Sequence, residues 1–249
     1  MPVLFIYFRA IKASWLTVFI FLPLIAYAIQ LRLIVRPEIF SNILIILCLL
    51  LYLRAQKSFA TKELIYITVL LLFWINYHSP IFGYIIIFGL FLDKALNKLI
   101  NNDTSFSWNH WFFWGGVIFI TGFLHHSGEH ILISTINLAS NGITKYTAEY
   151  TAAYEIYSNN IIVHISWALS LYVAIWSFIK KQYGFVFISL LLTYSSLSTS
   201  RLVTPTLLIN LCILALYFSK ITPDHLTNIR SSVQKTLIIA ATITSLSAL

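Results

Sequence analysis

The feature that most constrains this chain is a succession of apolar runs, each close to the length of a membrane-crossing helix. Such a helix needs about 20 mostly apolar residues. The runs extend through most of the 249 residues, of which 59% are hydrophobic and 10% charged, whereas a soluble domain is roughly one quarter charged. No soluble linker separates them. The pattern therefore predicts an all-α, polytopic transmembrane bundle that forms a single integral membrane domain over residues 1–249.

Apolar length and flanking charge predict about nine spanning helices. We expect them over Ser14–Gln30, Ile39–Leu53, Leu64–Tyr77, Ile81–Leu92, Trp108–Leu124, Asn160–Phe178, Tyr183–Leu197, Val203–Phe218 and Thr236–Leu249. The polar connector Lys94–Ser107 precedes the fifth helix, and the amphipathic loop His125–Asn159 follows it.

The basic residues predict the orientation. With a cytoplasmic N-terminus, only Arg32, Arg36, Lys145 and Arg201 of the 16 lysines and arginines lie on the outer face, as expected when positive charge stays inside. This predicts a multi-pass membrane protein with Arg201 and the His125–Asn159 loop on the outer, periplasm-like side. The net charge of +8 follows from topology, and no nucleic-acid module is visible. Membrane lipids are the expected partners.

Arg201 is the first candidate functional residue. It lies between two apolar spans, in a turn rich in hydroxyl groups that includes Ser200. A guanidinium at this depth either extends to the lipid headgroups or binds a phosphate ligand through two parallel hydrogen bonds. The second interpretation suits a lipid-linked pyrophosphate, and both remain open.

The outer loop begins with a histidine-rich segment. His126 and His130 are four residues apart and would share one face of a helix, with His125 and Glu129 beside them. This spacing is compatible with a zinc, copper or iron site, although no established metal-binding signature is present. The alternative is a polar helix end at the membrane interface, and no metal is the first expectation.

Asn160 and His164 open the sixth span on the same outer side. Asn160 suits the N-cap of a helix. His164 is either a packing residue or a contributor to a substrate site near Arg201.

The stretch Tyr157–Leu249 resembles the superfamily of O-antigen ligases and O-antigen polymerases. In that superfamily a helix ends on the periplasmic side in a Ser-Arg element, which Thr199, Ser200 and Arg201 match here. Lys180 and Lys181 match its basic inner turn, and Asn159 with Asn160 match its polar helix start. Before Tyr157, the chain resembles this superfamily only in the number of spans and in topology.

The resemblance implies a metal-independent membrane glycosyltransferase of lipopolysaccharide biosynthesis in the bacterial inner membrane, without a cofactor. Its substrate would be a glycan on undecaprenyl pyrophosphate, with Arg201 holding the pyrophosphate. Two features depart from the family pattern. Leu202 replaces a common glycine, and the large periplasmic loop expected further on would begin where the chain ends, at Leu249. The resemblance thus implies an N-terminal portion, half of a split enzyme or a degenerate member.

Two further functions fit the same residues. One is a non-enzymatic subunit that packs against other membrane proteins, favoured by sparse polar chemistry. The other is a membrane metal-binding protein that uses His125, His126, Glu129 and His130.

Overall fold

The computed structural model is built of α-helices. It describes residues 2–30, 38–77, 80–101, 107–124, 130, 133, 161–198 and 202–221. Within this part of the chain the helices are α1 (Pro2–Ala10), α2 (Trp15–Gln30), α3 (Glu38–Ser58), α4 (Thr61–Tyr77), α5 (Ile81–Asn101), α6 (Trp108–Thr121), α9 (Ile161–Ile179), α10 (Tyr183–Ser198) and α11 (Val203–Ile221). The predicted all-α class is confirmed.

The first eight expected segments each correspond to a helix, and the ninth, Thr236–Leu249, lies outside the described residues. Two expected helix ends were wrong, and one helix was not expected. Helix α3 continues past Leu53 to Ser58, and α5 continues to Asn101, through the first part of the expected connector. Helix α1 was not predicted at all. Charged residues such as Lys and Arg are good helix formers, so they can end an apolar run without ending its helix.

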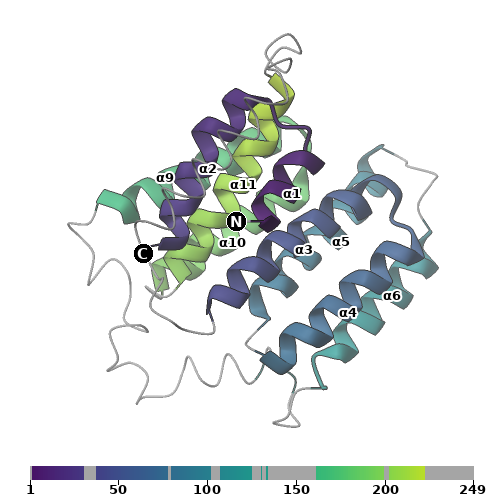
Figure 1. Ribbon diagram of the computed structural model, residues 1–249. Helices are drawn as coiled ribbons and strands as arrows, with labels where there is room; N and C mark the ends of the chain where they lie inside the picture. The colour runs from purple at the N-terminus through teal and green to yellow at the C-terminus, as the bar shows by residue number, and fades with distance from the viewer. Residues whose placement is uncertain are drawn as a thin grey trace.

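Helices α3 and α5 lie at the centre of the bundle (Figure 1). On one side they meet the group α2, α9, α10 and α11, and on the other side α4 and α6 (Figure 1). Two glycines allow α5 and α10 to cross closely. A Cβ atom on Gly89 would lie 2.7 Å from the Ile188 side chain, and one on Gly184 would meet the Gly89 carbonyl oxygen.

Within the described part of the chain, every lysine and arginine lies at one end of the bundle, which we call the basic end. They occur in the α1–α2 and α9–α10 turns, at the start of α4 and in the final turns of α1, α3, α5 and α11. Hydrogen bonds join these segments: Ser219 at the end of α11 donates to the carbonyl of Ile11, and Gln56 donates to both Asp93 and Gln182. The residues are Arg9, Lys12, Arg54, Lys57, Lys62, Lys94, Lys98, Lys180, Lys181 and Lys220.

Two of the described helices are long and apolar enough to cross a membrane. They comprise Phe40–Ser58 within α3 and Val203–Lys220 within α11. At 1.5 Å per residue, each of these segments is about 27–29 Å long, close to the thickness of a bilayer core. The apolar segments of α2, α9 and α10 are shorter.

Candidate functional site

Most of the residues that the sequence singled out lie outside the described part of the chain. These are Arg201, Ser200, Asn160, His125, His126 and Glu129. His130 and His164 are described, and both lie toward the end of the bundle opposite the basic end. For the other candidate residues, the structure describes only the helix ends that precede and follow them in the sequence.

His130 packs against the end of α6. Its ring stacks on Phe119 at 4.4 Å between centroids, and Phe123 meets it edge-on at 4.7 Å. The side chain is 2% exposed, and its Nε2 atom lies 3.0 Å from the carbonyl oxygen of Phe119. Where the chain is described, no group of three or more His, Cys, Asp or Glu residues could hold a metal ion. The His130 ring therefore packs on α6 with its Nε2 atom at the backbone, and the residues with which it would share a metal, His125, His126 and Glu129, lie outside the described residues.

His164 occupies an exposed position on α9, with its ring edge-on to Trp167 at 5.5 Å. The indole Nε1 of Trp167 donates to Ser196 Oγ at 3.1 Å. His164 is therefore joined through Trp167 to the last turn of α10. This is the helix end that precedes Arg201 in the sequence.

A polar seam, centred on Asn210 with Ser189 and Ser170, runs between α9, α10 and α11. Ser189 Oγ donates to Asn210 Oδ1 at 2.8 Å, and Asn210 Nδ2 donates to Ser170 Oγ at 2.9 Å. The same Nδ2 donates to the carbonyl of Thr206 at 2.8 Å. All three side chains of the seam are 0% exposed. An amide with its bonds satisfied in an apolar bundle fixes the register of the helices that supply its partners.

The seam continues toward the end opposite the basic end. The Thr206 hydroxyl donates to the carbonyl of Leu202, just before α11, and to that of Leu192 on α10. On α10, Thr193 and Ser196 bond carbonyls of their own helix. Some of the hydroxyl groups that precede Arg201 in the sequence are thus bonded to helix carbonyls. The sequence interpretation did not include Asn210, although an amide inside an apolar span was a usable signal.

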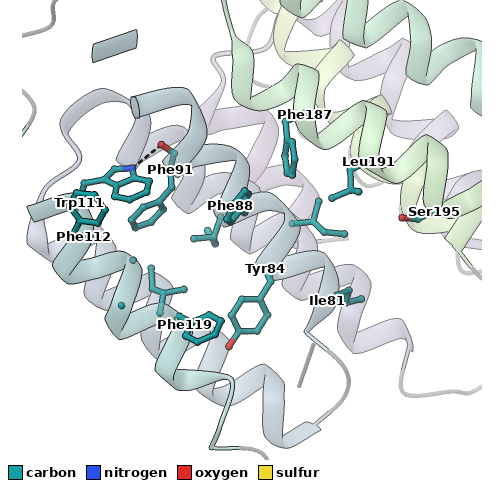
Figure 2. Close-up of a pocket in the computed structure, with 15 residues that line it drawn as sticks. Ile81, Tyr84, Phe88, Phe91, Trp111, Phe112, Phe119, Phe187, Leu191 and Ser195 are labelled. Carbon is teal, nitrogen blue, oxygen red and sulfur yellow. Dashed lines mark hydrogen bonds between the residues drawn. The ribbon is translucent and has the colours of Figure 1, made fainter. Parts of the chain in front are cut away.

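An apolar pocket of about 750 Å³ lies between α5, α6 and α10 (Figure 2). Its lining contains no charged residue, and its polar groups are few. Trp111 marks the side toward the basic end, where its indole donates to the carbonyl of Phe91 at 2.9 Å. The lining consists of Ile81, Tyr84, Ile85, Ile87, Phe88, Phe91, Trp111, Phe112, Gly115, Gly116, Ile118, Phe119, Phe187, Leu191 and Ser195.

The other side of the pocket lies toward the end where α5 begins and α10 finishes. Tyr84 closes part of it, with its hydroxyl 2.7 Å from Thr121 Oγ1. Ser195 lies at one edge, one turn beyond Leu191 on α10 (Figure 2). Such a lining suits a hydrocarbon chain, because it can bury apolar surface but has no partner for a charge.

A second polar site, which the sequence interpretation missed, surrounds Asp93 at the basic end. Asp93 is 2% exposed and accepts from Gln56 Nε2 at 3.0 Å and from the backbone N–H of Gly184 at 3.1 Å. The hydroxyl of Tyr52 is buried nearby, beside Gly184, and has no hydrogen-bond partner among the described residues. The only sequence signal was a lone acid directly after an apolar run.

Both cysteines are free and buried, Cys48 on α3 and Cys212 on α11. Buried free cysteines behave as small packing residues.

We found no protein-family model that matches the sequence, and no match among curated proteins or solved structures.

Proposed function

We propose that the protein is a polytopic inner-membrane protein whose basic end faces the cytoplasm. Two helices have the length and apolarity for a span. The clustering of all described lysines and arginines at one end supports this orientation, because basic residues are retained on the cytoplasmic side. Exposed apolar side chains on the outer faces, such as Phe19, Phe112 and Tyr194, would then contact lipid.

Within this arrangement, the protein binds a glycan carried on undecaprenyl pyrophosphate. The observation that carries this proposal is the apolar pocket between α5, α6 and α10. It offers a prenyl chain an uncharged lining, and Ser195 at its edge belongs to the helix that leads to Arg201 in the sequence. A lipid that lies in the pocket with its headgroup at the Ser195 side would therefore carry that headgroup toward the end of α10, which precedes Arg201 in the sequence.

The reaction is transfer of the glycan to an acceptor hydroxyl. The anomeric carbon exchanges its bond to a pyrophosphate oxygen for a bond to the acceptor oxygen, and the hydroxyl proton passes to water. Negative charge grows on the departing pyrophosphate. The Arg201 guanidinium stabilises it through two parallel hydrogen bonds. Ser200 adds a hydroxyl donor, and Asn160 and His164 contact the glycan or its acceptor. No metal or cofactor takes part.

Transfer of radiolabelled glycan from undecaprenyl pyrophosphate, measured in membranes that contain the whole chain, tests this function. Arg201→Ala is expected to lower transfer at least a hundredfold, and Arg201→Lys to lower it nearly as much, because lysine lacks the planar fork. The matched control is Lys98→Ala at the basic end. Full transfer by Arg201→Ala, at equal protein content of the membranes, would contradict the proposal.

A further inference from the structure

A second groove, which we call the α1–α3–α4 groove, opens on the other side of the bundle. It has a volume of about 410 Å³ and lies between α1, α3 and α4. Its walls are apolar and include Ile6 of α1, Leu47 and Leu50 of α3, and Val69 and Phe73 of α4. From Phe73 to Tyr66 it follows α4 for about 10 Å, at 1.5 Å per residue.

This groove differs from the α5–α6–α10 pocket in having a cation at one end. Arg54 lines it, one helical turn beyond Leu50 toward the basic end. Tyr66 lines it at the same end, and the Lys62 ammonium lies 5.9 Å from the centre of the Tyr66 ring. The groove is thus lined by apolar side chains along most of its length, and a basic and an aromatic side chain lie at one end.

The surrounding charge is complementary to an anion. Ten lysines and arginines gather at this end of the bundle, against two acids whose side chains are described, Glu63 and Asp93. The carboxylate of Asp93 is already bonded to Gln56 and to Gly184, and the Oε2 atom of Glu63 is buried. Among the described residues the basic side chains therefore outnumber the acids, and the mouth of the groove lies in a region of net positive charge.

We infer that the α1–α3–α4 groove binds an anionic phospholipid. One acyl chain lies along α3 and α4, and the headgroup phosphate accepts hydrogen bonds from Arg54 and Lys62. The Arg54 guanidinium can hold two phosphate oxygens at once. The Tyr66 ring occupies the interfacial depth at which tyrosine is enriched in membrane proteins. The inference relies on the membrane placement proposed above but not on Arg201.

Lipid binding to the full chain in detergent micelles tests the inference. We would titrate phosphatidylglycerol and phosphatidylcholine with identical acyl chains and measure bound lipid by native mass spectrometry. Arg54→Gln removes the charge, and Val69→Trp fills the groove from a position that is 58% exposed. The control is Lys98→Gln, at the basic end but outside the groove lining.

Phosphatidylglycerol is expected to bind at least fivefold more tightly than phosphatidylcholine, since one basic residue near a membrane surface contributes about 1 kcal/mol. Arg54→Gln should abolish this preference, and Val69→Trp should weaken the binding of both lipids. The Lys98→Gln control should change neither the preference nor the two affinities. Equal affinity for the two lipids would overturn the inference, as would an equal loss in Lys98→Gln. Competition by soluble glycerol phosphate at the same concentration would also overturn it, by indicating a free phosphate site.

The two proposals can fail separately. A chain that prefers phosphatidylglycerol through Arg54 but transfers no glycan would contradict the proposed activity and support this site. A chain that transfers glycan without any lipid preference would contradict this site and support the activity.

Discussion

The carboxylate of Asp93 on α5 accepts a hydrogen bond from the backbone N–H of Gly184, in the first turn of α10, at 3.1 Å. A negative charge at this position satisfies a free donor of the helix start and complements the helix dipole. Gln56 of α3 bonds the second carboxylate oxygen. Asp93 therefore joins three helices at the basic end of the bundle.

We expect Asp93→Ala to lower the free energy of unfolding by about 1–3 kcal/mol, because two donors lose a buried acceptor. Asp93→Asn keeps one carbonyl oxygen and should cost less. Thermal unfolding in detergent, followed by circular dichroism, measures the effect. Lys98→Ala, on the same helix, should change stability by no more than about 0.5 kcal/mol. An Asp93→Ala midpoint equal to that of the unchanged protein would exclude this role.

Two glycine-to-alanine substitutions should have opposite signs. A Cβ at Gly184 meets the Gly89 carbonyl oxygen and the Tyr52 hydroxyl, so the α5–α10 crossing must open. Gly184→Ala should therefore cost about 1–3 kcal/mol. A Cβ at Gly116 meets no atom within 4 Å, and Gly116→Ala should stabilise α6 by up to about 1 kcal/mol. Unfolding curves of both variants, recorded under the same conditions, give the sign of each change in stability. Equal changes in the two variants would argue against the close crossing of α5 and α10.

The polar seam predicts a third stability effect. Asn210→Leu removes one accepted and two donated hydrogen bonds and leaves Ser189 and Ser170 without their amide partner. We expect a loss of about 1–3 kcal/mol. Asn76→Leu is the control, because the exposed Asn76 side chain bonds the Leu72 carbonyl of its own helix and no other described residue. If both variants unfold alike, the seam does not determine helix packing.

Filling the apolar pocket should impair substrate use without unfolding the protein. Gly116 borders the pocket and has open space beside it, so a tryptophan there would occupy part of the volume proposed for the prenyl chain. We expect Gly116→Trp to lower glycan transfer at least tenfold, while Gly116→Ala retains it. The assay is paired with circular dichroism of each variant. Normal transfer by a folded Gly116→Trp protein would contradict the assignment of this pocket.

The helices were largely predictable from the sequence because the signal is local. An apolar run of suitable length, such as Tyr183–Leu197 or Val203–Phe218, forms a helix wherever it packs, and the structure has α10 and α11 there. Helix ends were less predictable. Arg54 and Lys57 end the apolar run of α3 but continue its helix to Ser58, because helix propensity and apolarity are different properties.

The polar sites were harder to predict because they depend on partners distant in sequence. Asp93 and Gly184 are 91 residues apart, and Ser170 and Asn210 are 40 apart. No spacing rule relates such pairs. His130 shows a related limit. Its ring packs on Phe119, a contact that its spacing to His126 does not reveal, and the metal interpretation of that spacing stays a prediction because His126 lies outside the described residues.

The central claim is that the protein holds a lipid-linked pyrophosphate through Arg201, and a binding measurement tests it most directly. We would compare the affinities of undecaprenyl pyrophosphate and undecaprenol for the unchanged protein and for Arg201→Ala in the same detergent. The account predicts that Arg201→Ala binds the pyrophosphate at least tenfold more weakly, a loss of about 1.4 kcal/mol or more, and binds undecaprenol unchanged. Equal pyrophosphate affinity in the two proteins would contradict it.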